Sequence, residues 1–149
     1  DIVKTMKVSE EPSGDAVKTV AVSCPIEVEA ALVQMLSDEE VDFVVEQDYE
    51  ILITYNKGGD PVGLVGYRED REWIDVHTLY MSMDYCQYWA IKEQISVVID
   101  LSLKKRVRMY SPDHLPPEAQ RAYYDCGLEV TATSNGASRW VRPVRGSRE

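Results

Sequence analysis

Two residues near the middle of the chain have side chains suited to proton transfer. Asp75 and His77 are two positions apart in a stretch that alternates apolar and polar residues. In a strand, both side chains would therefore lie on the same face of a sheet. A histidine beside a carboxylate can act as a general base near neutral pH. The same pair could equally be a plain surface or core contact, and the sequence leaves both alternatives open.

The cysteines and histidines do not form a recognisable metal-binding pattern. Cys24, Cys86 and Cys126 contain no CxxC pair, and His77 and His114 are far apart in the sequence. We therefore expect no metal site. Nothing near Cys86 or Cys126 in the sequence supplies a base or lowers a thiol pKa, so we expect small buried apolar residues rather than nucleophiles.

The charge is unevenly distributed along the chain of 149 residues, whose formal net charge is −10. Residues 1–103 contain 7 basic and 21 acidic side chains, whereas residues 104–149 contain 9 basic and 5 acidic ones. The acidic balance argues against general binding to a nucleic-acid backbone, although an acidic decoy for a nucleic-acid-binding partner is conceivable. The basic C-terminal third either faces an anion or an acidic partner or is a solvated edge.

Length and composition indicate an ordinary globular domain. Apolar residues make up 44% of the chain and charged residues 28%, which is close to typical usage. The polar start predicts a flexible N-terminal segment at 1–16, followed by a single domain at 17–149. No apolar run approaches the roughly 18 residues of a membrane span, so we expect a soluble, cytoplasmic protein.

The elements that must position these residues alternate between strand and helix periodicity. Strands are predicted at 17–23, 49–55, 62–68, 73–81, 107–110, 128–133 and 138–144, and helices at 25–36, 37–47, 86–103 and 116–125. The strands between 49 and 81 should form an antiparallel meander. The Asn135-Gly136 pair predicts a terminal hairpin, and Gly127 should end the helix before it.

Three of the predicted helices have assignable faces or caps. In the first helix, Ile26, Ala30, Val33 and Leu36 recur at helical spacing and are predicted to face the core, with Ser23 as N-cap. Ser37 and Glu40 form a capping-box pattern at the start of the second. In the long helix, Ile91, Ile95, Val98, Ile99 and Ser102 share one face, which should pack on the meander.

This order of elements is similar to that of the GNAT superfamily of acyl-CoA-dependent N-acyltransferases. Residues 75–81 resemble the family's fourth strand, where an acidic residue precedes a Leu-Tyr pair on the strand that splays to admit the acyl group. Residues 121–129 resemble its late helix and the strand that follows, and residues 62–67 resemble its third strand. The resemblance implies an α/β (α+β) fold with a mixed, mostly antiparallel sheet of about six to seven strands and helices on both faces.

The resemblance also implies an activity and a set of site residues. A GNAT-like enzyme would move an acetyl or other acyl group from acyl-CoA to an amine by direct attack, without a metal. Asp75 would be the base, through a water or together with His77, and Tyr123 the acid. The residues expected to contact acetyl-CoA are Leu79, Tyr80, Met81, Gln87, Tyr88, Trp89, Ala90 and Ile91. The expected partner is an amine substrate or a basic protein.

The chain departs from the family pattern where the pyrophosphate should bind. Family members follow the fourth strand with an Arg or Gln and then glycines, so that bare backbone N–H groups at a helix N-terminus hold the pyrophosphate. Residues 85–91 contain no glycine here, and Tyr88 and Trp89 occupy the loop. Pro116 stands where an Asn often begins the late helix.

Two consequences follow from this departure. The alternative function is a protein of the same fold that has lost acyl-CoA binding and acts as a non-catalytic binding or structural protein. A Trp89 side chain lying between the splayed strands would exclude the cofactor. If the cofactor does bind, phosphate contacts are expected among Lys104, Lys105, Arg106, Arg139, Arg142, Arg145 and Arg148.

Overall fold

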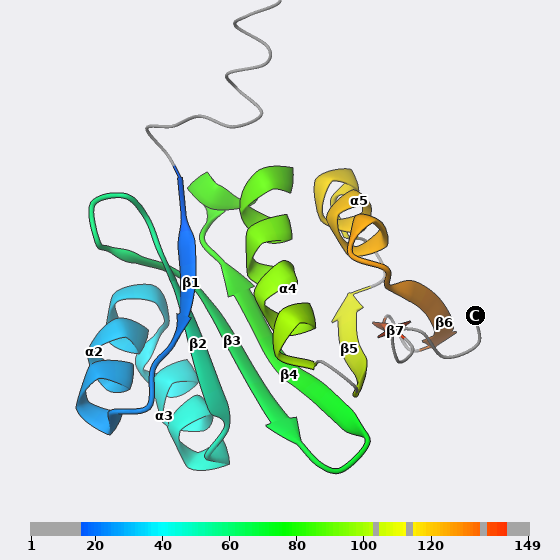
Figure 1. Ribbon diagram of the computed structural model, residues 1–149. Helices are drawn as coiled ribbons and strands as arrows, with labels where there is room; N and C mark the ends of the chain where they lie inside the picture. The colour runs from blue at the N-terminus through cyan, green and yellow to red at the C-terminus, as the bar shows by residue number, and fades with distance from the viewer. Residues whose placement is uncertain (1–15, 103–104, 113–114, 135–136, 143–149) are drawn as a thin grey trace, which may run out of the picture.

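The computed structural model describes residues 16–102, 105–112, 115–134 and 137–142 (Figure 1). The predicted N-terminal segment, apart from Ala16, lies outside these residues, as do Lys104, His114, Asn135, Gly136, Arg145 and Arg148. In chain order the elements are β1 (Lys18–Ala21), α2 (Pro25–Met35), α3 (Asp38–Gln47), β2 (Glu50–Tyr55), β3 (Pro61–Glu69), β4 (Trp73–Met81), η2 (Met83–Tyr85), α4 (Tyr88–Ser102), β5 (Arg106–Pro112), α5 (Pro117–Asp125), β6 (Glu129–Ser134) and β7 (Ala137–Arg142).

The strands form one seven-stranded sheet in the order β1-β2-β3-β4-β5-β7-β6. All neighbouring pairs are antiparallel except β4 and β5, which are parallel. Helices α4 and α5 pack on one face and α2 and α3 on the other (Figure 1). The mixed, mostly antiparallel sheet with helices on both faces is therefore confirmed, and so is the meander of β2, β3 and β4.

Two apolar cores fill the space between the sheet and its helices. The larger lies under α4 and α5, and its fully buried members include Val65, Ile95 and Met109. The smaller lies under α2 and α3 around Leu32 and Leu64. Fully burying each such side chain contributes about 1.5–3 kcal/mol relative to leaving it exposed, so the two cores hold both layers of helices on the sheet.

The predicted faces are confirmed for α4 and wrong for α2. Ile91, Ile95 and Val98 on α4 are buried, as their spacing predicts. On α2, by contrast, Ile26 and Val33 are exposed. The side chains of α2 that pack on the sheet are Val28, Ala31, Leu32 and Met35. Helix α2 has apolar residues on two sides, and the sequence alone cannot tell which side meets the core.

Local rules account for two of the three helix ends predicted from the sequence. Ser37 and Glu40 form the predicted capping box at α3, where the Ser37 N–H donates to Glu40 Oε1 at 2.9 Å. Gly127, at φ +90°, follows the last turn of α5 as predicted. Ser23 is not the cap of α2, because the helix begins one residue later, with Cys24 at the N-cap position.

A buried polar network ties α4 to the sheet. The Gln94 amide Nε2 donates to the carbonyl oxygen of Tyr80 at 3.0 Å and lies 3.5 Å from Thr54 Oγ1. The Thr54 hydroxyl is hydrogen-bonded to the Thr19 hydroxyl at 2.7 Å. Gly63 makes this approach possible, because a Cβ at that position would lie 2.9 Å from Gln94 Nε2. The network joins β1, β2 and β4 to α4 and fixes the helix relative to the end of β4.

The Glu93 carboxylate provides a second link between α4 and β1, and it makes stability depend on pH. It accepts the Thr19 backbone N–H at 3.0 Å. Partial burial raises the pKa of Glu93, and this hydrogen bond only partly offsets the effect. When the pKa of a group is higher in the folded than in the unfolded state, the group stabilises the fold fully at pH values below its unfolded-state pKa. That contribution is lost as the pH rises from the ordinary glutamate pKa of about 4.3 through the folded value.

We therefore expect Glu93→Gln to raise the urea midpoint at pH 7, because the amide oxygen can still accept the Thr19 N–H without a desolvated charge. The difference from the wild type should shrink as the pH falls toward 4, where both forms are neutral. Urea unfolding followed by circular dichroism at several pH values measures this. A variant that is less stable at pH 7 would contradict the desolvation argument.

Candidate active site

Strands β4 and β5 pair for only part of their length. Residues 73–76 of β4 are in register with residues 106–109 of β5, and no pairing continues beyond them. Figure 1 shows the two strands diverging toward the end of the sheet where α4 begins. The stretch of β4 at residues 77–81, which lacks a β5 partner, is called the divergence below. It is the part of the sheet that the resemblance predicts to splay.

Along the divergence, one edge of β4 has backbone polar groups without a ladder partner on β5. The Ser82 N–H donates to the Val62 carbonyl oxygen at 2.8 Å. This bond shows which opposed residue pairs of the antiparallel β3–β4 ladder are the hydrogen-bonded ones. By alternation, the polar groups of Tyr80 point to β3, and those of Leu79 and Met81 point to the opposite edge. An unpaired strand edge of this kind can bind an extended ligand that carries amide groups.

A β-bulge at His77 changes the face on which the following side chains lie. Gly66 is in register with Thr78 and Tyr67 with Val76, so His77 has no partner on β3. Leu79 consequently packs on the α4–α5 core and Tyr80 on the α2–α3 core. The expectation of uninterrupted alternation along β4 is wrong at this residue, because a bulge adds one residue to one strand only.

The Asp75 carboxylate is held by an arginine from the neighbouring strand. Arg108 Nε lies 2.6 Å from Asp75 Oδ1, and Arg108 Nη2 lies 3.3 Å from Oδ2. The guanidinium also lies 4.0 Å from the ring centre of Trp73. The hydrogen bond to Asp75 raises the pKa of Arg108, although burial opposes it. The carboxylate thus lies on the face away from Ile74 and Val76, with both oxygens engaged by a permanent cation.

A double-mutant cycle on Asp75 and Arg108, each replaced by Ala, should give a coupling energy of about 1 kcal/mol in urea unfolding. The reason is that the two side chains are only 20% and 27% exposed and meet through two hydrogen bonds. The Glu72–Arg106 pair, with side chains 69% and 41% exposed, is the matched control. Its coupling should be below about 0.5 kcal/mol. Equal coupling energies for the two pairs would show that the lower exposure and the second hydrogen bond of the Asp75–Arg108 pair do not strengthen it.

His77 lies on the same side of the sheet as Asp75 but has a different partner. Its exposed imidazole stacks on the Tyr49 ring, with ring centres 5.5 Å apart and planes 9° from parallel. The Arg68 guanidinium carbon lies 4.8 Å from the same ring. The structure therefore brings His77 and Asp75 to one face without showing a hydrogen bond between them, and it leaves the imidazole accessible from the α2–α3 side.

Tyr123 lies on the other side of the sheet, in the core under α5. It is 3% exposed, and its ring meets Trp140 edge-on with centres 5.0 Å apart. Burial raises the pKa of the Tyr123 phenol, and the nearby Cys86 adds to the effect. Cys86 Sγ in turn approaches the Met81 carbonyl oxygen at 3.7 Å. A phenol that stays protonated at neutral pH is thus close to the end of the divergence.

The side chain of Tyr88 joins the start of α4 to α5. Its hydroxyl donates to Asp125 Oδ2 at 2.5 Å. Two cations lie over its ring, with Arg121 Cζ 4.1 Å and Lys92 Nζ 5.6 Å from the centre. The first residue of α4 therefore carries an aromatic side chain bonded to a carboxylate of α5, where the resemblance predicts glycines, and two basic side chains lie over its ring.

Trp89 does not lie in the divergence. Its indole N–H donates to Gln87 Oε1 at 3.1 Å, and its ring meets Tyr85 edge-on. One turn later on the same side of α4, Glu93 binds β1. Trp89 therefore points toward β1 and away from β5, while Ala90 and Ile91 are buried under the helix.

One of the two cysteines predicted to be buried lies in a different environment. Cys86 is exposed, which corrects the prediction of a buried residue, and Cys126 is partly buried beside Ser96. Partial desolvation of the sulfur raises the pKa of both thiols, although the Cys86 residue as a whole is exposed. Among the described residues, no group of three His, Cys, Asp or Glu side chains is placed to hold a metal ion. Among the helices that the structure describes, none is long and apolar enough to cross a membrane.

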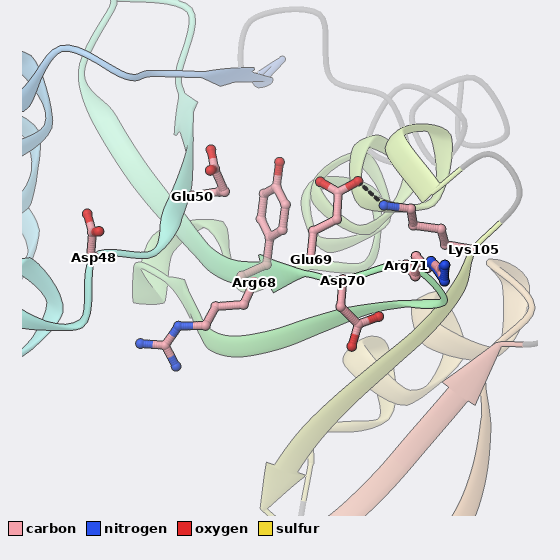
Figure 2. Close-up of a pocket in the computed structure, with 8 residues that line it drawn as sticks. Asp48, Glu50, Arg68, Glu69, Asp70, Arg71 and Lys105 are labelled. Carbon is pink, nitrogen blue, oxygen red and sulfur yellow. Dashed lines mark hydrogen bonds and ion pairs between the residues drawn. The ribbon is translucent and has the colours of Figure 1, made fainter.

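A charged surface hollow of about 570 Å³ lies at the opposite end of β4 from the divergence (Figure 2). It is lined by Asp48, Glu50, Tyr67, Arg68, Glu69, Asp70, Arg71 and Lys105. Lys105 forms an ion pair with Glu69 across it. Its charges are mixed and partly paired within the protein, and it shares no lining residue with the divergence. We therefore place the candidate site at the divergence.

Sequence reasoning missed three residues that shape the site: Tyr49, Trp73 and Arg108. Arg108 alternates with the buried Val107 and Met109, which predicts only that it points away from the core. Its pairing with Asp75 depends on β5 lying next to β4, a contact across 33 residues. No local pattern carries that information.

Comparison with known proteins gives a structural match without a sequence match. No family model matches the chain, and no curated protein matches it either. A PaiA N-acetyltransferase from Thermoplasma acidophilum, solved with coenzyme A, has a TM-score of 0.64 at 14% identity, and the match covers 86% of this chain and 99% of that one. A GNAT-family acetyltransferase from Bacillus cereus has a TM-score of 0.65 at 10% identity, covering 87% and 99%.

A third solved structure is a spermidine N-acetyltransferase chimera from Vibrio cholerae and hSSAT. It has a TM-score of 0.59 at 13% identity, and the match covers 85% of this chain and 95% of that one. All three are similar over nearly their whole length, although their sequences are very different from this one. This chain therefore has the fold of the GNAT acetyltransferases.

Proposed function

We propose that this protein is an acyl-CoA-dependent N-acyltransferase that transfers an acetyl or other acyl group to an amine. The observation that carries the proposal is the divergence of β4 from β5, because it leaves backbone groups of Leu79 and Met81 without ladder partners. A protonated phenol lies on one side of the sheet there, and an exposed imidazole on the other. An acid and a base on opposite sides of one opening suit a transfer between two substrates.

The residues present fit acyl-CoA better at its acyl end than at its phosphate end. The unpaired edge of β4 suits an extended arm with amide groups. Where the phosphates of acyl-CoA are expected, the α4 N-terminus and the cations Lys92 and Arg121 favour an anion. The Tyr88 side chain and its bond to Asp125 lie in the same place. Side-chain cations rather than glycine-exposed amides would therefore supply most of the phosphate binding.

The chain's own residues can manage both protons of the reaction. When bound, acyl-CoA supplies an acyl group already activated as a thioester. The attacking amine must lose a proton, and the exposed His77 imidazole can accept it from the α2–α3 side. Asp75, fixed by Arg108, would act as base through a water or orient the amine by its charge. The Tyr123 Oη holds the proton that the departing sulfur needs.

Thermal unfolding in the presence of acetyl-CoA tests binding. Acetyl-CoA at about a hundredfold excess over its dissociation constant should stabilise the fold by about 2.7 kcal/mol. Release of free thiol on addition of polyamines or basic peptides then tests transfer. No rise in melting temperature at millimolar acetyl-CoA would overturn the proposal.

A non-catalytic role for this fold is the second candidate, and two observations favour it. Tyr88, which stands where the resemblance predicts glycine, is bonded to Asp125, and the Arg108–Asp75 ion pair engages the acidic side chain of β4. Binding of acetyl-CoA without transfer to any amine, or no binding at all, would support this candidate. If acetyl-CoA does not bind to the wild type, Tyr88→Gly tests the reason. Binding of acetyl-CoA to this variant would show that the Tyr88 side chain is the obstacle.

A further inference from the structure

The outer face of α2 is apolar although nothing in the described structure covers it. Ile26 is 79% exposed and Val33 is 55% exposed. With Ala30, which is also exposed, they recur at positions i, i+4 and i+7 and form a stripe. The residues that pack on the sheet lie on the opposite side of the helix. A helix that is apolar on two sides is normally covered on both.

Acidic side chains lie beside this stripe, and neither α2 nor α3 contains a basic one. At 100° per residue, Glu27 and Glu29 lie on its two sides. Helices α2 and α3 together contain Glu27, Glu29, Asp38, Glu39, Glu40, Asp42 and Glu46, and no Lys or Arg. The stripe is therefore apolar along its centre, has a carboxylate on each side, and lies on a pair of helices that carries only negative side-chain charge.

This charge decides between the possible occupants. A two-fold contact between copies would place the same acidic surface against itself, which is repulsive. Lipid headgroups of an anionic membrane and nucleic-acid backbones would be repelled in the same way. A cationic partner gains attraction at the rim and burial of apolar surface at the centre.

We propose that the outer face of α2 is a docking surface for a cationic amphipathic segment of another protein. Apolar side chains of that segment would cover Ile26 and Val33, and its Lys or Arg side chains would lie near Glu27 and Glu29. The surface faces away from the sheet, so docking there is independent of acyl transfer at the divergence. A bound partner would be held beside the side of the sheet that carries Asp75 and His77.

A short, fluorescently labelled peptide of leucine and lysine at helical spacing is the probe. Binding is measured by fluorescence anisotropy near physiological salt, where long-range attraction is screened. The peptide should bind the wild type and bind I26S/V33S at least about tenfold more weakly, since loss of two apolar contacts exceeds the 1.4 kcal/mol that equals a factor of ten. E27K/E29K should weaken binding as well.

The matched control is M83S, which removes another exposed apolar side chain, 85% exposed on η2. It should bind like the wild type, and unchanged urea midpoints should show that all variants are folded. Equal binding by I26S/V33S and M83S, or equal binding of a leucine–glutamate peptide, would overturn the proposal. So would sedimentation showing that the wild type dimerises and I26S/V33S does not, because the occupant would then be a second copy.

Discussion

Replacing Tyr123 by Phe should lower the rate of acyl transfer by about 10²–10⁴-fold, the range expected when a positioned proton donor is lost. The ring contact with Trp140 would remain, so the fold should be retained. Because burial raises the pKa of Tyr123, the phenol stays protonated well above neutral pH. Wild-type activity should therefore not fall through ionisation of this group between pH 7 and about 10.

Tyr124→Phe is the matched control for this prediction. Tyr124 also meets Trp140 edge-on, with ring centres 5.2 Å apart, but it is 54% exposed. Its variant should keep wild-type kcat. Steady-state kinetics, together with melting temperatures in acetyl-CoA, would show whether binding survives while turnover is lost. A Tyr123→Phe enzyme with unchanged kcat would remove this residue from the mechanism.

Gly63→Ala is expected to destabilise the protein by about 2–4 kcal/mol, combining overpacking with the loss of buried hydrogen bonds. The added Cβ would lie 2.9 Å from Gln94 Nε2, 3.0 Å from Thr54 Cβ and 3.1 Å from Met81 Sδ. Gln94 is 1% exposed and has little room to move. Each kcal/mol corresponds to roughly 2–4 °C for a chain of this size, so the melting temperature should fall markedly.

Gly58→Ala provides the comparison for this effect. A Cβ there would meet only Asn56 Oδ1 at 3.5 Å and Asp60 Oδ2 at 3.9 Å, which are ordinary contacts. Its stability should stay within about 0.5 kcal/mol of the wild type. In the double variant Gly63→Ala/Gln94→Ala, the two effects should be less than additive, because the first change already displaces the Gln94 amide. Strict additivity would show that the added methyl group does not reach this network.

The sequence determined the elements whose rules are local. The capping box at Ser37 needs only residues three apart, and the stop at Gly127 needs only a residue that tolerates positive φ. The buried face of α4 follows from a single apolar stripe at helical spacing. The order of these elements resembles that of the GNAT superfamily, and this resemblance was enough to indicate the fold.

The tertiary structure decided the features that depend on contacts between distant segments. Helix α2 has two apolar stripes, and only its packing on the sheet selects the inner one. The bulge at His77 depends on its register with β3, and the engagement of Asp75 depends on β5 lying beside β4. Local periodicity fixes which way a side chain points within its own element. The partner that it meets is set by long-range pairing, so the chemistry of the site is known only once the strands are assembled.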